Sequence, residues 1–163
     1  MSMDGKNPIV LLHGVFTDKV LSLLKEREPE KVFILEGRPA LSGLLKTYPS
    51  LKKNGLNCFV IADNMPGFLF NLNFVHEVWI AGMNSPGKRV NTPVGSLILA
   101  VLAKHHQKPV YVFVNKNVKV SKKIDLNKNA LKFLGKDIAP KGIKSFVPLI
   151  DELPKNLITE IYE

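Results

Sequence analysis

Five short, nearly continuous apolar runs recur along the chain, separated by segments in which apolar residues return every three or four positions. The runs cover residues 8–14, 31–37, 56–63, 77–83 and 109–115. Runs of this length, rich in β-branched and aliphatic residues, are typical of parallel strands that are covered on both faces. Since strands that alternate with helices indicate a doubly wound sheet, the pattern predicts an α/β fold with helices on both faces of a mostly parallel sheet.

Two of the intervening segments carry signals of a helix start. Thr17 before Asp18 is an N-cap signal, and the apolar residues behind it predict the buried side of that helix: Val20, Leu21, Leu23 and Leu24. Thr92-Pro93 predicts a second start, with a cap residue followed by proline at the first helical position. The predicted buried face of this second helix repeats at i, i+3, i+4, i+7 and i+8: Val94, Leu97, Ile98, Val101 and Leu102.

The pattern weakens after residue 115. A short helix around residues 130–134 and a last strand at residues 146–150 are the elements predicted there. Because the chain shows neither an internal repeat nor a domain boundary, we expect residues 1–163 to form a single Rossmann-like domain.

The composition is that of a globular protein. Hydrophobic residues make up 45% of the 163 residues and charged residues 23%, and no apolar run reaches the ~18 residues that a membrane span needs. The N-terminal residues lack the apolar core of a signal peptide. The single cysteine, Cys58, excludes an intrachain disulfide and a cysteine-rich metal site. We therefore expect a cytoplasmic protein with no membrane partner, no metal and no cofactor.

Positive charge is concentrated in the second half of the chain. The formal net charge is +9, and residues 104–144 contain eleven lysines against two acids, Asp125 and Asp137. Such a stretch could attract RNA or another polyanion, or it could be a solvated surface rich in lysine. Arginine, the usual reader of bases, is absent from this stretch.

Polar and glycine-rich segments follow the predicted strands, at residues 13–17, 36–39, 62–67 and 82–89. In an open parallel sheet, ligands bind at the carboxyl ends of the strands. The most suggestive stretch has Lys88 and Arg89 in a basic loop that leads to the predicted helix start, where Thr92, Ser96 and free N–H groups could hold a phosphate. An ordinary solvated loop with a helix cap is the alternative interpretation.

Candidate catalytic residues do not form a set. Asp63 and Glu36 stand at strand ends and could act as acid or base, but Asp63 also fits a plain cap and turn. His13 ends a strand and is explained more simply by a hydrogen bond than by catalysis, and Cys58 lies within a strand as a small buried hydrophobe. Neither acid has an evident partner nucleophile or base.

Several segments, in order and at matching spacing, are similar to one family. LEGRPALSG and GLNCFVIADNMPGFLF resemble a stretch bounded by E-x-R-P and D-N-M-A-G motifs, and VWIAGMNSPGKRVNTPVGSLILAVLAKHHQKPVYVF resembles VGAD…NKIGT…LAVLAK-x-H…PFYV. The closing VPLIDELPKNLITEIYE resembles FD-x-TP-x-x-LI…ITE. Over residues 8–161 the chain thus resembles the C-terminal half of the initiation factor 2B alpha/beta/delta and 5-methylthioribose-1-phosphate isomerase family.

This resemblance implies a Rossmann-like C-terminal domain, which in the family usually follows a helical domain that we do not find in this sequence. The family's general acid–base aspartate falls on Asn84, whose amide cannot exchange protons as a carboxylate does. The Asn-Lys pair that contacts substrate falls on Thr92-Pro93, and Cys58 does not match the family's catalytic cysteine. The candidate ligand-binding residues are Arg38, Asp63, Asn64, Gly82, Asn84, Lys88, Arg89, Thr92, Gly95 and Ser96.

These observations favour a non-catalytic protein, similar to initiation factor 2B, that self-associates or pairs with a related subunit and binds a phosphorylated sugar or nucleotide. One alternative is an aldose–ketose sugar-phosphate isomerase that uses Asp63, His13 or Glu36. A second alternative is a translation-linked or RNA-associated binding module that uses residues 104–144.

Overall fold

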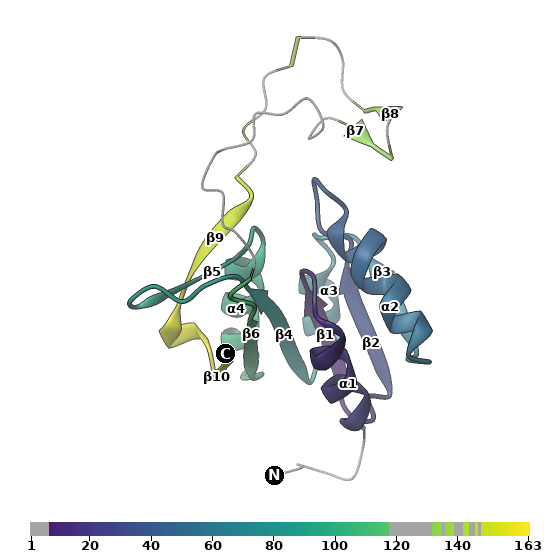
Figure 1. Ribbon diagram of the computed structural model, residues 1–163, viewed down its shortest axis with the longest axis vertical. Helices are drawn as coiled ribbons and strands as arrows, with labels where there is room; N and C mark the ends of the chain where they lie inside the picture. The colour runs from purple at the N-terminus through teal and green to yellow at the C-terminus, as the bar shows by residue number, and fades with distance from the viewer. Residues whose placement is uncertain (1–6, 118–131, 135, 139–141, 144–145, 147) are drawn as a thin grey trace.

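A six-stranded sheet forms the centre of the computed structural model, which describes residues 7–117, 132–134, 136–138, 142–143, 146 and 148–163 (Figure 1). The strands are β1 (Ile9–His13), β2 (Lys31–Leu35), β3 (Cys58–Ile61), β4 (Glu77–Gly82), β6 (Val110–Val114) and β10 (Glu160–Tyr162). All are parallel, in the order β10-β6-β4-β1-β2-β3. Counted along the chain this is 3-2-1-4-5-6, the Rossmann order, so the predicted fold class and its five strands are confirmed.

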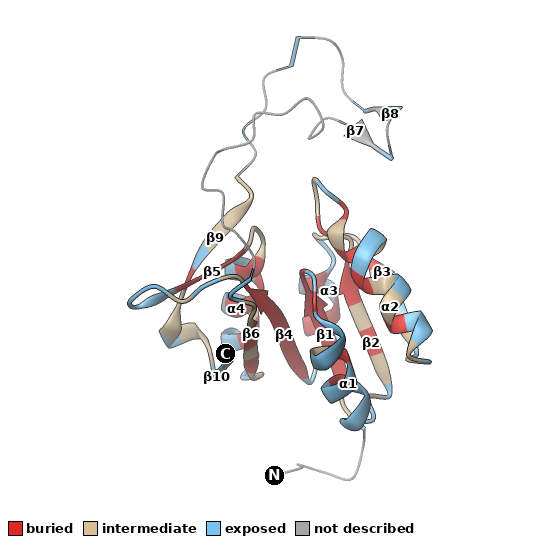
Figure 2. Cartoon of the chain, in the orientation of Figure 1, coloured by how far each residue is buried: buried red, intermediate tan, exposed pale blue. Residues whose placement is uncertain are grey.

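Helices cover both faces of the sheet. On one face α1 (Asp18–Glu26) and α2 (Tyr48–Lys53) bury Leu21, Leu24 and Leu51 in one core cluster, with the π-helical turn η1 (Gly43–Thr47) leading into α2. On the other face α3 (Pro66–Asn71) and α4 (Ser96–His105) contribute to a second cluster. Side chains alternate between the two clusters along each strand, so the sheet is buried throughout its centre (Figure 2).

The helix start predicted at Thr92-Pro93 is wrong. These residues end a strand, β5 (Arg89–Pro93), which pairs antiparallel with β9 (Ile150–Pro154). The pairing places Val90 opposite Leu153, both fully buried, and this long-range contact outweighs the local cap signal. The helix begins instead at Ser96, after Gly95 in the left-handed region at φ 99°.

The predicted buried face of α4 is wrong at three positions, Leu97, Ile98 and Val101, whereas Leu102 is partly buried against the core. The inward side chains of α4 are Ser96, Leu99, Ala100 and Ala103. Leu97, Ile98 and Val101 are 41%, 65% and 51% exposed. The helix is therefore apolar on two faces, of which the sheet covers only one.

The C-terminal part differs from the sequence prediction in two further places. The last strand was predicted at residues 146–150, but β9 overlaps that range only at Ile150. β7 (Lys132–Phe133) and β8 (Lys136–Asp137) form a small antiparallel pair where a short helix was predicted, and residues 130–131 of that helix lie outside the described residues. A 3-10 turn, η3 (Lys155–Leu157), links β9 to β10.

Within the described residues, no helix is long and apolar enough to cross a membrane.

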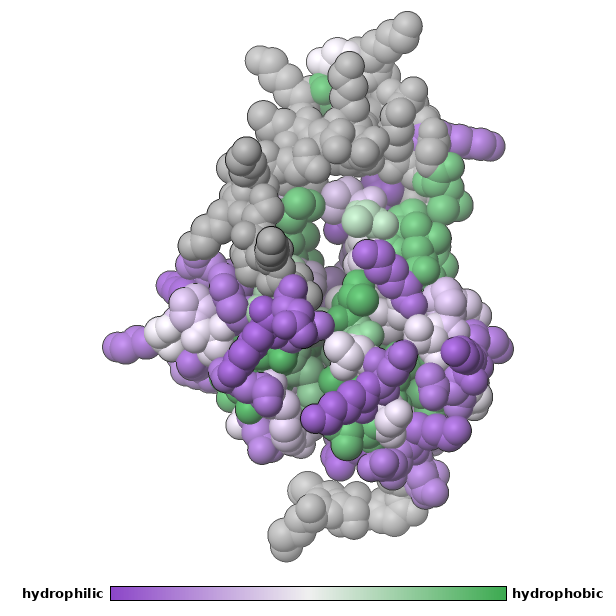
Figure 3. All heavy atoms as spheres, in the orientation of Figure 1, coloured by the Kyte–Doolittle hydropathy of each residue, from purple (hydrophilic) through white to green (hydrophobic). Residues whose placement is uncertain are grey.

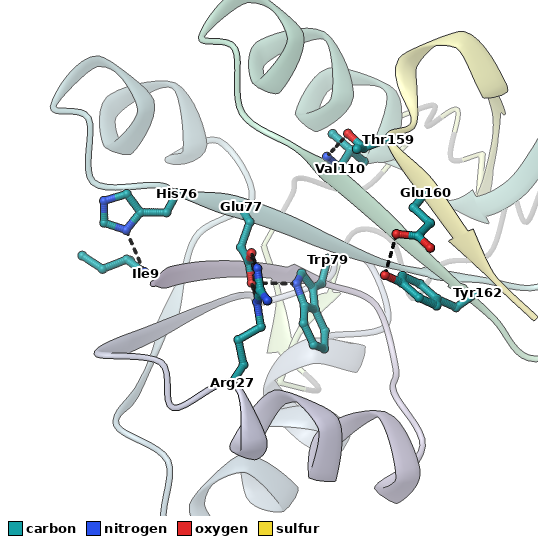
Figure 4. Close-up of polar contacts among 9 residues, drawn as sticks. All are labelled: Ile9, Arg27, His76, Glu77, Trp79, Val110, Thr159, Glu160 and Tyr162. Atoms are coloured by element: carbon teal, nitrogen blue, oxygen red, sulfur yellow. Dashed lines mark hydrogen bonds and ion pairs between the residues drawn. The ribbon is translucent and has the colours of Figure 1, made fainter. Parts of the chain in front are cut away.

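A charged network ties the end of α1 to β4 (Figure 4). The Arg27 guanidinium donates three hydrogen bonds to Glu77: from Nε to Oε1 at 2.8 Å and to Oε2 at 3.1 Å, and from Nη2 to Oε2 at 2.6 Å. The Trp79 indole N–H donates to the same carboxylate at 3.1 Å. Glu77 is 3% exposed, so these donors compensate a buried charge. The hydrogen bonds and charge of Glu77 raise the pKa of Arg27.

Candidate functional site

Polar side chains gather at one edge of the sheet because the carboxyl ends of parallel strands meet there. His13 ends β1, Arg38 lies in the loop after β2, Asp63 follows β3 and Asn84 follows β4. The sequence predicted a ligand site at this edge, and we call it the polar edge.

Asp63 holds the loop that follows β2. Its Oδ1 accepts a hydrogen bond from the backbone N–H of Gly37 at 2.9 Å, and its Oδ2 accepts one from the N–H of Arg38 at 2.7 Å. Gly37 has a φ of 78°, a conformation that favours glycine. Both carboxylate oxygens are thus engaged in positioning the loop, while the neighbouring Asn64 is exposed.

His13 is a buried imidazole. It is 2% exposed, and burial lowers its pKa below the ordinary 6.5, opposed in part by the Val94 carbonyl and by the charges of Asp63 and Asp151. Its Nε2 lies 2.9 Å from the Val94 carbonyl oxygen, which only accepts, so Nε2 carries the proton. Nδ1 is then a bare acceptor, and it has no partner within the described part of the chain.

Asn84 is paired with Asn91 across a short hairpin. The Asn91 Nδ2 donates to Asn84 Oδ1 at 2.6 Å, and the backbone N–H of Asn91 donates to the Asn84 carbonyl at 2.9 Å. Asn91 is 2% exposed, and its Oδ1 is a second buried acceptor without a donor among the described residues; the Ser85 hydroxyl is likewise buried and unpaired there.

The amino end of α4 already holds a carboxylate. Asp151 Oδ2 accepts hydrogen bonds from the N–H groups of Gly95 at 2.9 Å and Leu97 at 3.0 Å, and the Ser96 hydroxyl donates to the Pro93 carbonyl at 2.6 Å. The sequence predicted that a phosphate could bind free N–H groups at this helix start. Two of these donors are instead satisfied by Asp151.

Thr92 and Gly82 lie in packed positions. Thr92 is fully buried in β5, away from the helix start where the sequence placed it, and its hydroxyl lies 3.4 Å from the Asp151 carbonyl. A Cβ at Gly82 would lie 2.9 Å from Cγ1 of Val112, so the strands leave no room for a side chain there. Packing alone explains both residue types.

Lys88 and Arg89 line a hollow of about 530 Å³ on the β5–β9 ribbon, together with Lys155. The Arg89 guanidinium donates to the Glu152 carbonyl at 3.2 Å. These cations therefore gather around the ribbon, with Gly87, Pro154 and Asn156 completing the lining.

The charges of Asp63 and Asp151 both act on His13, whose Nε2 donates to the Val94 carbonyl just before α4. Lys88 and Arg89 instead lie with Lys155. Sequence reasoning missed Asp151 because its contact with Gly95 spans 56 positions and no local motif marks it. Asn91 and Lys155 were missed for the same reason, since the β5–β9 pairing was not foreseen. No group of three or more His, Cys, Asp or Glu side chains suited to a metal ion occurs among the described residues.

Comparison with known sequences gives the same family from a sequence profile and from individual relatives. The sequence profile of the Initiation factor 2 subunit family matches residues 5–162. The methylthioribose-1-phosphate isomerase of Thermosipho africanus is 31% identical over 159 residues, and that of Carboxydothermus hydrogenoformans is 33% identical over 159 residues. Each match covers 91% of this chain and 46% of the relative, so the chain spans about half the length of these curated proteins.

Two solved structures share the fold. Translation initiation factor eIF-2B subunit delta from A. fulgidus has a TM-score of 0.82 at 22% identity, covering 97% of this chain and 52% of its own. The 5-methylthioribose 1-phosphate isomerase from Pyrococcus horikoshii has a TM-score of 0.80 at 21% identity, covering 95% of this chain and 49% of its own.

Proposed function

Because the chain belongs to the initiation factor 2 subunit family, we propose that it binds a sugar phosphate at the polar edge and self-associates, without isomerising the ligand. The observation that carries this is the pair of buried acceptors without donors among the described residues, His13 Nδ1 and Asn91 Oδ1. An unpaired buried acceptor costs about 1–3 kcal/mol, and sugar hydroxyls supply the missing donors.

Arg38 is the cation proposed to receive the phosphate group. Arg38 lies in the loop that Asp63 holds by accepting hydrogen bonds from two backbone N–H groups. The backbone position from which the Arg38 side chain extends is therefore fixed. A guanidinium binds phosphate oxygens bidentately. The amino end of α4 is the less favourable place, because the carboxylate of Asp151 would repel a phosphate and must first be displaced from Gly95 and Leu97.

Isomerase activity is the second candidate function. The curated relatives that are 31% and 33% identical are named as isomerases, and they favour this candidate over a purely binding role. The geometry favours binding, since the position that the resemblance assigns to the acid–base aspartate is the amide of Asn84, hydrogen-bonded to Asn91. Asp63 is a remaining carboxylate at the polar edge, and both its oxygens already accept backbone hydrogen bonds.

Self-association is supported by exposed apolar side chains on α3 and α4, two helices that pack against each other. Phe68 and Leu72 on the α3 side are 60% and 43% exposed, and Ile98 and Val101 on α4 are 65% and 51% exposed. A helix that is apolar on all sides is normally buried. A second copy of the chain covering α3 and α4 would bury these side chains.

Calorimetric titration with methylthioribose-1-phosphate tests the binding role. We expect saturable binding that Arg38→Gln weakens at least about tenfold, in line with the loss of a charged hydrogen bond. Arg89→Gln is the matched control, because Arg89 lies on the β5–β9 ribbon, and it should change affinity less than about twofold. If Arg89→Gln abolishes binding and Arg38→Gln does not, the site lies on the ribbon instead.

A turnover assay separates binding from isomerisation. The proposal expects no aldose-to-ketose conversion by the wild-type chain. Conversion that is lost in Asp63→Asn, with binding retained, would establish the isomerase instead and reject the non-catalytic role.

A further inference from the structure

A second hollow, of about 580 Å³, lies on the α1 side of the molecule. Its lining comes from three separate segments: the loop before α1 with the first turns of that helix, the end of β6, and β10. The hollow adjoins the carboxyl ends of β1, β6 and β10, but its lining does not include His13, Arg38, Asp63 or Asn84 of the polar edge. Figure 3 shows this side of the molecule, where apolar side chains (green) reach the surface between hydrophilic ones (purple).

Aromatic rings form part of the lining. The rings of Phe113 and Tyr162 stack with centroids 4.8 Å apart and planes 10° apart, and Phe16 meets Phe113 edge-on at 6.4 Å. Phe113 is 8% exposed, whereas Tyr162 is 41% exposed, so the stack runs from the core to the surface. Val15 and Leu23 add aliphatic surface that is 43% exposed in each case.

Positive charge at the rim is only partly compensated. Lys116 forms an ion pair with Glu163 at 2.8 Å. The side chain of Lys19, in the first turn of α1, is exposed, and its ammonium forms no ion pair or hydrogen bond with the described residues. The ammonium of Lys19 is therefore available to an anion beside the apolar lining.

We propose that this hollow binds a small planar aromatic anion. The ring lies against Tyr162 and the aliphatic surface of Val15 and Leu23, and the anionic group pairs with the Lys19 ammonium. The volume of about 580 Å³ falls within the roughly 300–1,000 Å³ of small-molecule sites. Offset and edge-on contacts with aromatic rings add to the energy of burial.

The probes are 1-naphthoate and its neutral analogue 1-naphthamide, titrated by calorimetry and by amide chemical shifts. We expect saturable binding of 1-naphthoate with shifts at residues 15–23 and 113–117, and affinity for the amide at least about fivefold lower. Lys19→Gln should weaken 1-naphthoate by a similar factor and leave the amide unchanged. Lys25→Gln, an exposed lysine in the last turn of the same helix, should change neither.

Leu23→Glu is the second variant, because it places a like charge within the apolar lining and should abolish 1-naphthoate binding. Leu45→Glu, at another exposed leucine on η1, is its control. Absence of saturable binding at about 1 mM ligand overturns the proposal. So does binding that neither Lys19→Gln nor Leu23→Glu weakens, or shifts confined to residues 36–38 and 95–97 of the polar edge.

Discussion

Two aspartates determine which backbone groups remain open to a ligand at the polar edge. Asp63 accepts hydrogen bonds from Gly37 and Arg38, and Asp151 accepts them from Gly95 and Leu97. Loops that would otherwise present N–H groups to an anion are thereby closed by side chains of the protein itself. The buried side-chain groups that remain without partners in the described structure are uncharged and belong to His13, Ser85 and Asn91.

Removing the Asp151 carboxylate should destabilise the fold. Asp151→Ala leaves two N–H groups at the start of α4 without an acceptor, so we expect the free energy of unfolding in urea to fall by about 1–2 kcal/mol. Glu26→Ala, an exposed acid on α1, should change it by less than about 0.5 kcal/mol. Inorganic phosphate should stabilise Asp151→Ala more than the wild type. Equal losses in both variants would mean that Asp151 does not cap α4.

His13 should make stability depend on pH. Its folded pKa lies below the ordinary 6.5, so the unfolded chain binds the proton more readily. The stabilising contribution is present above pH 6.5 and is lost as pH falls below that value. We expect the drop in unfolding free energy between about pH 7.5 and 5.5 to be smaller in His13→Gln than in the wild type. His105→Gln, on the exposed last turn of α4, should retain the full drop; an unchanged drop in His13→Gln contradicts the buried neutral imidazole.

The sequence located part of the polar edge. Strand ends could be read from apolar runs, and this placed His13 and Asp63 correctly at the carboxyl ends of β1 and β3. Hydrogen-bond partners could not be read, because Asp151 and Asn91 reach the edge through pairing of β5 with a strand some sixty positions away. Local residue patterns do not predict pairing between strands that lie so far apart in the sequence.

At the scale of elements, α4 shows why apolar periodicity alone misassigned a buried face. The stripe Leu97, Ile98 and Val101 has helical spacing, yet a second stripe of smaller side chains packs on the sheet. Small residues allow the helix to approach the strands closely, and the larger ones are left outward. One apolar face of α4 packs on the sheet, and the other would need a second surface to bury it.

Ile98→Asp should prevent self-association. A buried carboxylate at the centre of a contact between copies costs several kcal/mol, so sedimentation should show monomers under conditions where the wild type forms dimers. Thermal unfolding of the variant should stay close to that of the monomeric wild type, because Ile98 is 65% exposed. Leu45→Asp, 57% exposed on η1, should leave the dimer intact. A wild type that is monomeric at about 100 µM rules out self-association through this face.

Breaking the Arg27–Glu77 contact between α1 and β4 should lower the free energy of unfolding. Arg27→Met leaves Glu77, 3% exposed, with only the Trp79 indole as a donor among the contacts described, and we expect a loss of about 2–3 kcal/mol in unfolding free energy. Lys25→Met on the same helix should cost less than about 0.5 kcal/mol. Urea denaturation measures both. A loss below about 0.5 kcal/mol for Arg27→Met would show that solvent replaces the guanidinium.

At the scale of the molecule, the order of strands and helices was predictable and the β5–β9 ribbon was not. Continuous apolar runs identify parallel strands, and the requirement to cover both sheet faces then orders the helices. The ribbon could not be predicted in this way, because the local sequence of β5 is typical of a basic loop and a helix cap. β5 forms a strand only because it pairs with β9. The same ribbon carries Lys88, Arg89 and Lys155. The lysine-rich stretch predicted as a candidate for binding a polyanion, residues 104–144, lies in part outside the described residues, so that prediction stays untested.

Binding of a sugar phosphate at the polar edge should show in thermal unfolding with methylthioribose-1-phosphate, with methylthioribose and inorganic phosphate as separate controls. Ligand at 100 times its dissociation constant stabilises a binding protein by about 2.7 kcal/mol, which raises the midpoint of a domain this size by several degrees. We expect such a rise with the sugar phosphate, a smaller one with either control, and its loss in Arg38→Gln. An unchanged midpoint with the sugar phosphate would contradict the assignment of a ligand to the polar edge.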